Sequence, residues 1–487
     1  MIHDELKLLI TQTLGHLPTA DQRGAIDVFC QFITDRRQQA VMVLRGSAGT
    51  GKTTLAAAIV RALLQLRQKL VLLAPTGRAA KVFSLYSGQA AFTIHRRIYR
   101  QRSAGDLSSF NLNDNLHTDT LFIVDEASMI SRQPAGSTFG SGSLLDDLVQ
   151  YVYGGRNCRM LLIGDTAQLP PVGEDDAPAL STDVLRGYGQ EVYDFDLLEV
   201  LRQSQESGIL WNATYIRQSL AQPLGLPCLR IFADISVVPG DELIESLAGS
   251  YSRVGIDETI VVTRSNKRAN IYNEGIRRTV LDREEELSRG DQLMIVKNNY
   301  SVFPGNEARG VRAGNNSAGA EGELARHPSF LANGDRCVVQ RLRNVQELYG
   351  FHFADATLLM PDYDDYEFSA KVLLTTLTAE APALTRDQQE LLYNKVMEDY
   401  ADIPLKAERI KKLKDDAYYN ALQIKFGYAV TCHKAQGGQW AHVYIAQGYM
   451  TDDMLTPDYL HWLYTALTRA TERVFLVNWP AKQISGA

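Results

Sequence analysis

Apolar and polar positions follow two different patterns over residues 1–200. Short apolar runs, which are typical of buried strands, stand at 41–46, 69–75, 120–128 and 159–165. Residues 5–40 and 52–68 instead carry apolar side chains at helical spacing. Strands that alternate with helices build a parallel sheet covered on both faces. The pattern therefore predicts an α/β domain over residues 1–200.

A second group of apolar runs follows and is interrupted by a different pattern. Residues 259–266 read as a strand that leads into a helix, and further apolar strands are expected at 425–437, 442–447 and 473–479. Between about 290 and 423 the chain carries short alternating strands and then two polar helices, which favours a small barrel with a helical extension. We therefore expect a second α/β unit over 201–290 and 424–487, with the insertion at 291–423.

Composition limits the class of protein. A chain of 487 residues is too long for one core, and 45% hydrophobic with 22% charged residues is typical of folded globular domains. The formal net charge of -7 gives no basic footprint, so a nucleic-acid surface would have to be a local groove. No run is apolar enough to span a membrane, and the N-terminus does not resemble a signal peptide.

The cysteines give a hint about the compartment. They are scattered, odd in number and form no C-x-x-C pair: Cys30, Cys158, Cys228, Cys337 and Cys432. This spacing argues against a zinc site or a disulfide framework and favours a reducing environment, so we expect a cytoplasmic protein.

The segment Gly46–Thr53 matches the phosphate-loop pattern G-x-x-x-x-G-K-[ST], with a predicted strand before it and a helix after it. Glycines allow backbone N–H groups to wrap a phosphate, and the helix N-terminus favours negative charge. Lys52 would neutralise the β- and γ-phosphates, and the Thr53 hydroxyl would hold Mg²⁺. The expected nucleotide contacts in this loop are Gly46, Gly49, Thr50, Gly51, Lys52, Thr53 and Thr54. A chance glycine turn is the alternative, but motif and context agree.

Two later strand ends carry further candidate chemistry. Asp125 and Glu126 end the run at 120–128; Asp125 would hold Mg²⁺ and Glu126 would activate the attacking water. Gln168 follows the next strand and could reach the γ-phosphate. Taken alone, the acidic pair could be a solvated strand end and Gln168 could lie in an ordinary turn. Their order after a phosphate loop favours an ATP-hydrolysing site.

Several segments together resemble superfamily 1 helicases, specifically the subgroup B branch typified by the RecD and phage Dda enzymes. The resembling segments are Thr19–Gln22, Ala74–Ala80, Thr93–His95, Glu199–Gln203, Thr263–Asn266, Ala429–Gly437 and Tyr464–Ala470. The resemblance runs in the expected order over most of the chain, and the last two segments are highly specific together. It implies two RecA-like parallel-sheet motor domains, with an SH3-like barrel inserted in the second.

The resemblance also assigns residues at the nucleotide. Gln22 would read the adenine, and Arg202 and Arg469 would stabilise charge on the transferring phosphoryl group. An arginine outside a motif is more often a surface ion pair, but here the motif context reverses that expectation. Gly437 and Gln439 are expected near the nucleotide. Many family members carry Glu where this chain has Gln439, although a neutral amide can still bond a ribose hydroxyl.

The DNA side of the resemblance implies single-stranded DNA and single/double-strand junctions as partners, with movement from 5′ to 3′. The expected DNA contacts are Pro75, Thr76, Arg78, His95, Thr431, His433 and Lys434, of which His433 could equally be a packing residue. An insertion at 98–118 would supply a strand-separating pin. Cofactors would be ATP and Mg²⁺, the protein would act as a monomer, and repair or recombination proteins are candidate partners.

Two other functions remain open from the sequence. The chain could be an ATP-gated nucleic-acid-binding subunit of a nuclease or repair complex that does not itself unwind. It could also be an RNA helicase, because phosphate contacts do not identify the sugar. A nucleotide hydrolysis assay with DNA and matched RNA discriminates these readings.

Overall fold

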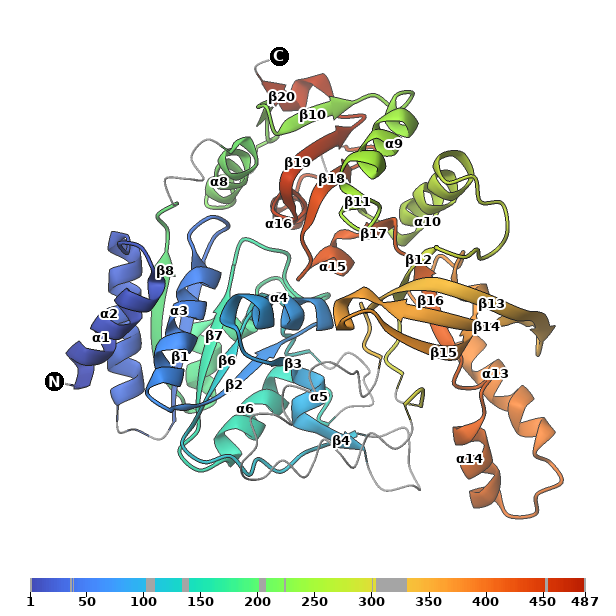
Figure 1. The fold of residues 1–487 in the computed structure, drawn as a ribbon, viewed down its shortest axis with the longest axis horizontal. Helices are drawn as coiled ribbons and strands as arrows, with labels where there is room; N and C mark the ends of the chain where they lie inside the picture. The colour runs from blue at the N-terminus through green and yellow to red at the C-terminus, as the bar shows by residue number, and fades with distance from the viewer. Residues whose placement is uncertain are drawn as a thin grey trace.

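The described residues form two larger parallel sheets and a closed barrel (Figure 1). The computed structural model describes residues 2–35, 37, 39–101, 110–133, 140–200, 207–222, 225–299, 301–303, 331–451 and 454–485. Within these ranges every helix is too short or too polar to cross a membrane. The α/β architecture that the periodicity predicts is confirmed.

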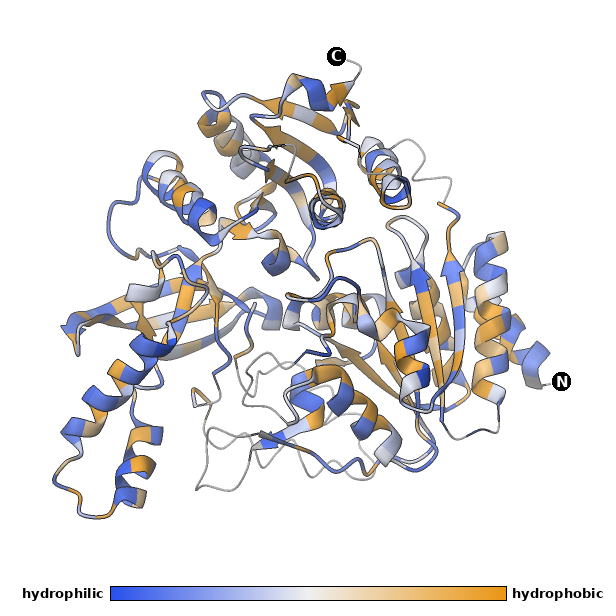
Figure 2. Cartoon of the chain, turned by 180° about the vertical axis from the view of Figure 1, so that it is seen from behind, coloured by the Kyte–Doolittle hydropathy of each residue, from blue (hydrophilic) through white to orange (hydrophobic). Residues whose placement is uncertain are grey.

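The first sheet is parallel and has the order β3-β2-β6-β7-β1-β8. Its strands are β1 (Ala40–Gly46), β2 (Lys69–Ala74), β3 (Ala91–Thr93), β6 (Thr120–Val124), β7 (Arg159–Gly164) and β8 (Glu191–Leu197). The helices in this part are α1 (Ile2–Leu14), α2 (Ala20–Thr34), α3 (Lys52–Gln65), α4 (Gly77–Ser87), α5 (Ile94–Ile98), α6 (Leu144–Gly154) and α7 (Thr182–Gly187). Helices cover both faces, and Figure 2 shows the strands between them largely in orange. The sequence pattern did not predict β8, an edge strand with only one buried residue, Leu197.

The second sheet is also parallel, with the order β10-β19-β18-β11-β17. Its strands are β10 (Ile235–Val238), β11 (Thr259–Thr263), β17 (Ala429–Thr431), β18 (Trp440–Ala446) and β19 (Ala470–Val477). The helices beside it are α8 (Gly208–Leu220), α9 (Leu243–Val254), α10 (Asn266–Gly275), α15 (Cys432–Ala435) and α16 (Pro457–Leu467). Strand β18 is buried along its whole length, and α16 is buried from Tyr459 to Leu467 except at the half-buried His461, so these elements form the centre of this domain.

A closed barrel interrupts the second sheet domain between α10 and β17. Its strands are β12 (Gln292–Ile295), β13 (Arg336–Leu348), β14 (Phe351–Met360), β15 (Tyr366–Leu373) and β16 (Leu422–Phe426). Helices α13 (Arg386–Asp399) and α14 (Lys406–Asp415) stand between β15 and β16 and extend away from the sheets (Figure 1). The expected strand at 425–437 is wrong in two respects: Lys425 and Phe426 pair with β12 within the barrel, and only Ala429–Thr431 form β17 before the short helix α15 begins at Cys432.

A buried ionic cluster fixes the barrel to the second sheet domain. The Asp291 carboxylate is fully buried just before β12. It receives Arg277 at 3.0 Å, Arg283 at 2.7 Å and the Tyr428 hydroxyl at 2.8 Å. Removing one member of such a cluster leaves an unpaired buried charge, so we expect its loss to destabilise the contact between the barrel and this domain.

The barrel also touches the first sheet domain at α4. Lys81 donates its Nζ to the Pro361 carbonyl at 2.6 Å, and an added Cβ at Gly77 would lie only 2.5 Å from Asp335 Oδ1. Pro361 begins a 3-10 helix (Pro361–Tyr363) after β14. The barrel thus contacts both sheet domains, and its contact with the first lies at α4.

Candidate functional site

The phosphate loop connects β1 to α3 and is stabilised by hydrogen bonds between its own residues. Gly49 and Gly51 have φ of 78° and 79°, a backbone region that favours glycine. Lys52 is the first residue of α3, and its Nζ donates to the Ser47 carbonyl at 2.9 Å. The Thr50 hydroxyl donates to the same carbonyl at 2.8 Å. Ser47 Oγ is buried and has no hydrogen-bond partner among the described residues. The loop therefore leaves polar groups available for an anion.

Asp125 and Glu126 lie just beyond β6, beside the phosphate loop. Asp125 donates its backbone N–H to Leu73 at 3.0 Å, and its Oδ1 accepts the Glu126 N–H at 2.9 Å. Burial, reinforced by the Glu126 carboxylate, raises the pKa of Asp125 to about 7, whereas the Lys52 ammonium lowers it. Glu126 has a left-handed φ of 52°. A buried carboxylate at this position suits a cation such as Mg²⁺.

Gln22 lies at the start of α2, at the edge of this site. Thr19 and Gln22 form a reciprocal capping box, in which Gln22 Oε1 accepts the Thr19 N–H at 3.1 Å. Gln22 Nε2 is buried without a hydrogen-bond partner in the described ranges, so it remains able to donate. Asp21 Oδ2 accepts the N–H groups of Leu198 and Glu199, which ties α2 to the segment after β8. Arg202, expected further along that segment, lies outside the described residues.

The turn at 165–169, after β7, is held by the second sheet domain. Leu169 donates its N–H to Thr465 Oγ1 at 2.7 Å, and its carbonyl accepts from Gln436 Nε2 at 2.6 Å. His461 Nδ1 lies 2.9 Å from the Ala167 carbonyl. Gln168 is buried in this turn, and its Oε1 has no partner within the described part of the chain. The structure thus brings Gln168 to the boundary between the two sheets.

Arg469 follows α16 and lies on the second-domain side of this boundary. Only 3% of it is exposed. Its Nε donates to the Thr465 carbonyl at 3.1 Å, one Nη to the Gly438 carbonyl at 3.1 Å and the other to Thr468 Oγ1 at 3.2 Å. These bonds hold the guanidinium within its own domain.

Gly437 and Gln439, expected near the nucleotide, lie against the N-terminus of α4 instead. An added Cβ at Gly437 would be 2.9 Å from Thr76 Oγ1. The Gln439 carbonyl accepts a hydrogen bond from Arg78, and the Gln439 side chain is exposed. Their expected contact with the nucleotide stays a prediction, while their observed neighbours belong to the candidate DNA segment.

The candidate DNA residues of the first domain follow β2 and β3. Pro75 and Thr76 form the turn before α4, where Thr76 Oγ1 caps the helix by accepting the Ala79 N–H at 3.2 Å. Arg78 lies 4.2 Å from the centre of the Trp440 ring, a cation–π contact across the domain boundary. His95 lies 5.7 Å from the Tyr99 ring, and burial lowers its pKa to about 4. His95 is therefore neutral at pH 7 and suits hydrogen bonding rather than charge neutralisation.

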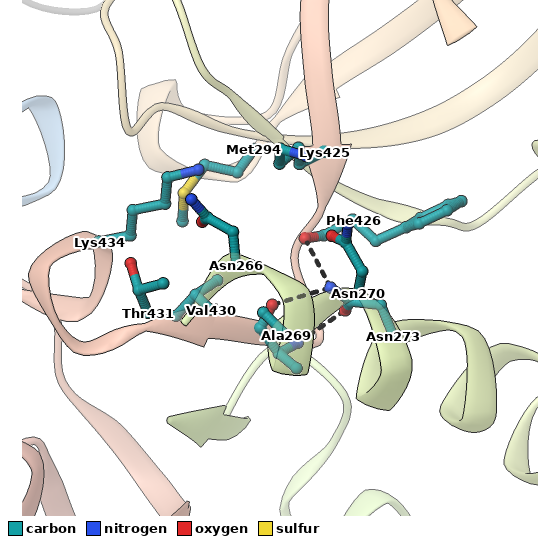
Figure 3. A pocket seen from close by; sticks show the side chains of 11 residues that line it. Asn266, Ala269, Asn270, Asn273, Met294, Lys425, Phe426, Val430, Thr431 and Lys434 are labelled. Carbon is teal, nitrogen blue, oxygen red and sulfur yellow. Dashed lines mark hydrogen bonds between the residues drawn. The ribbon is translucent and has the colours of Figure 1, made fainter. Parts of the chain in front are cut away.

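Two of the candidate DNA residues of the second domain, Thr431 and Lys434, line a small pocket (Figure 3). The pocket is lined by Asn266, Ala269, Asn270, Asn273, Met294, Lys425, Phe426, Ala429, Val430, Thr431 and Lys434. The side chains of Asn266 and Lys434 reach toward Met294, and burial lowers the pKa of Lys434 to about 8. His433, beside them in sequence, is exposed. The sequence analysis did not single out Asn270 or Lys425, which precede or follow the recognised segments without matching a motif.

The insertion expected at 98–118 begins as a hairpin. Strand β4 (Tyr99–Gln101) pairs antiparallel with β5 (Phe110–Leu112). Residues 102–109, which would form the tip of the expected pin, lie outside the described residues.

Comparison with known proteins agrees with this arrangement. A family model described as AAA domain matches residues 19–218, and one described as UvrD-like helicase C-terminal domain matches residues 426–477. The ATP-dependent RecD2 DNA helicase of Deinococcus radiodurans is 28% identical over 197 residues, which is 40% of this chain and 24% of that protein. The ATP-dependent DNA helicase dda of Enterobacteria phage T4 is 27% identical over 306 residues, covering 58% of this chain and 62% of that protein.

A protein of Methanocaldococcus jannaschii is 22% identical over 491 residues, covering 93% of this chain and 38% of that protein. The chain therefore spans less than two thirds of the length of these three relatives. A crystal structure of Pif1 helicase from Bacteroides in complex with ADP-AlF3 and ssDNA is 14% identical, with a TM-score of 0.48 and coverage of 97% of this chain and 95% of that one. Two family models in this order, together with the RecD2 and Dda relatives, confirm the resemblance to superfamily 1 helicases of the subgroup B, RecD/Dda-like branch.

Proposed function

We propose that this chain is an ATP-dependent DNA helicase that moves along single-stranded DNA from 5′ to 3′ and acts as a monomer. The observation that carries the proposal is the contact between the two sheet domains. There the 165–169 turn of the phosphate-loop domain bonds to Gln436 and Thr465, which lie in the two most specific motifs of the other domain. ATP hydrolysis at such a contact can change how the two domains meet, and that change can drive movement.

The residues at the strand ends fit a magnesium nucleotide. Ser47 Oγ, in the loop whose glycines can cradle a phosphate, and Gln168 Oε1, after β7, are both buried without a hydrogen-bond partner in the described part of the chain. Thr53 and Asp125 would hold Mg²⁺, which supplies neutralisation of the phosphate charge. Lys52 would bind the β- and γ-phosphates, Gln22 the adenine, and Glu126 would orient and deprotonate the attacking water.

Glu126→Gln should slow ATP hydrolysis by roughly 10²–10⁴-fold, because the amide keeps the shape of the side chain but cannot accept the proton. Nucleotide affinity should remain near that of the wild type. Steady-state turnover and equilibrium binding of a fluorescent ATP analogue measure the two quantities. Glu191→Gln, an exposed glutamate at the opposite end of the first sheet, is the matched control. Loss of nucleotide binding in Glu126→Gln would make Glu126 a structural residue.

The DNA strand would lie across both domains, over the turn before α4 and the turn before α15. Thr76 and Thr431 offer hydroxyls, and Lys434 and Arg78 offer charge. Arg78 already contacts Trp440 and Gln439 across the boundary, which links the candidate DNA surface to the position of the two domains. A DNA strand bound there would be contacted differently when the two domains move relative to each other.

His95→Ala or Thr431→Ala should weaken DNA stimulation of the ATPase and spare the DNA-free rate. The reason is that both residues are proposed to contact the strand and not the nucleotide. ATPase rate against DNA concentration measures the effect, and DNA affinity should also fall with added salt because phosphate contacts release counterions. Equal loss of the basal and the stimulated rate in Thr431→Ala would assign Thr431 to the nucleotide side.

An unwinding assay tests the proposed function as a whole. Duplexes with a 5′ or a 3′ single-stranded overhang, in DNA and in matched RNA, are offered with ATP. Unwinding of the 5′-overhang DNA alone is the expected result. DNA-stimulated hydrolysis without unwinding would favour the nucleic-acid-binding subunit of a nuclease or repair complex, and unwinding of RNA would favour an RNA helicase.

A further inference from the structure

The hydroxyl of Tyr464 joins the two sheet domains at the phosphate loop. Tyr464 lies on α16 and is fully buried. Its hydroxyl accepts the backbone N–H of Ala48 at 2.9 Å and donates to Asp165 Oδ2 at 2.6 Å. Ala48 follows β1 and Asp165 follows β7, and these strands are neighbours in the first sheet. One side-chain atom of the second domain thus bonds to two adjacent strand ends of the first.

The two bonds have a fixed direction. Burial and the Asp165 carboxylate hold the pKa of Tyr464 well above its usual value, so the hydroxyl keeps its proton near neutral pH and can donate it to Asp165. Asp165 Oδ1 separately accepts the Ala167 N–H at 3.0 Å, which keeps the carboxylate in place. A buried hydroxyl with both a donor and an acceptor satisfied is a rigid junction, since losing it leaves unpaired groups.

Hydrogen bonds at the end of α16 connect Tyr464 to Arg469. Thr468 donates its N–H to the Tyr464 carbonyl at 3.0 Å, and Arg469 Nε donates to the Thr465 carbonyl at 3.1 Å. Tyr464 and Arg469 are therefore linked through about one helical turn. The position of α16 on the first domain decides where the Arg469 guanidinium stands relative to the phosphate loop.

We propose that Tyr464 is a positioning residue for hydrolysis. Its hydroxyl fixes the position of α16 relative to the phosphate loop and Asp165, so that Arg469 reaches the transferring phosphoryl group when the domains close. This role rests on the proposed ATPase function. It assigns to Tyr464 an effect on the rate of the chemical step, exerted through Arg469, and not a contact with the bound nucleotide.

Tyr464→Phe removes only the hydroxyl and tests the proposal by its kinetics. We expect kcat to fall about tenfold, because one buried junction is lost, while KM for ATP changes little. Tyr459→Phe is the matched control: Tyr459 is a buried tyrosine on the same helix, and its hydroxyl bonds to Gln447 at 2.8 Å within the second domain. That control should keep wild-type turnover. A raised KM with unchanged kcat in Tyr464→Phe would overturn the proposal.

A double-mutant cycle with Arg469→Ala distinguishes positioning from an independent effect. If Tyr464 acts through Arg469, adding Tyr464→Phe to Arg469→Ala should lower kcat no further. A second tenfold loss in the double variant would contradict positioning.

Amide hydrogen exchange tests the hydrogen bond between Tyr464 and Ala48 independently of ATP hydrolysis. The peptide that contains Ala48 should exchange faster in Tyr464→Phe than in the wild type or in Tyr459→Phe. Unchanged exchange would show that the bond does not exist in solution and would overturn the proposal. A wild-type protein that exchanges as expected but hydrolyses no ATP would instead refute the proposed function, so the two failures are distinguishable.

Discussion

Lys52→Ala is expected to abolish ATP hydrolysis while leaving the fold intact. Lys52 places the positive charge of the phosphate loop, and no neighbouring side chain of the loop Gly46–Thr53 can replace it. Within the described part of the chain its Nζ donates a hydrogen bond to the Ser47 carbonyl at 2.9 Å, so we expect its removal to cost little stability. Release of phosphate by the purified variant, with and without DNA, measures the effect.

The control for this variant is Lys69→Ala, which removes an exposed lysine at the start of β2. It should hydrolyse ATP at the wild-type rate, and thermal unfolding should show both variants folded. Appreciable turnover in Lys52→Ala would refute the assignment of the phosphate loop, and with it the proposed function.

Arg469→Ala is expected to lower kcat by roughly 10³–10⁵-fold and to weaken ATP binding much less, because an arginine of this kind acts mainly on charge that develops in the transition state. The guanidinium now bonds to the carbonyls of Thr465 and Gly438, and it must exchange these partners for the phosphoryl group. Comparison of kcat with nucleotide affinity measures the two effects.

Truncation of a buried arginine also leaves carbonyls unpaired, at a cost of about 1–3 kcal/mol in stability. Thermal unfolding must therefore accompany the kinetics. Arg473→Ala, an arginine of β19 that bonds to the Ala233 carbonyl at 3.4 Å, is the matched control and should keep its turnover. If Arg469→Ala lost affinity in proportion to turnover, Arg469 would be a binding residue instead.

The sequence predicted the central strands and the phosphate loop because local patterns determine them. Strands β1, β6 and β7 are buried on both faces, so they read as unbroken apolar runs with glycine or carboxylates at their ends. Strand β8 was not predicted because it is an edge strand that is half exposed, and its Asp194 and Asp196 interrupt the apolar pattern and form ion pairs with Arg45. The end of the barrel at Phe426 was missed because β16 and β17 are separated only by Gly427 and Tyr428.

The contacts between domains could not be predicted from local patterns. Trp440 lies under Arg78, and Tyr464 bonds to Ala48, although each pair is separated by more than half of the chain. Nothing in the neighbouring residues of either partner indicates the other. The motifs identify which segments carry chemistry, whereas the pairing of Gly437 and Gln439 with α4 depends on how the two sheets are assembled.

The barrel and the two sheet domains are connected by a closed loop of contacts. The Asp291 cluster fixes the barrel to the second sheet, Lys81 joins the barrel to α4, and Tyr464 joins the second sheet back to the first. In a loop of stiff bodies, rotation at one joint must be accompanied by movement at another. We therefore expect a change at the Tyr464 junction to be transmitted to the Lys81–Pro361 bond, where the barrel meets the first domain.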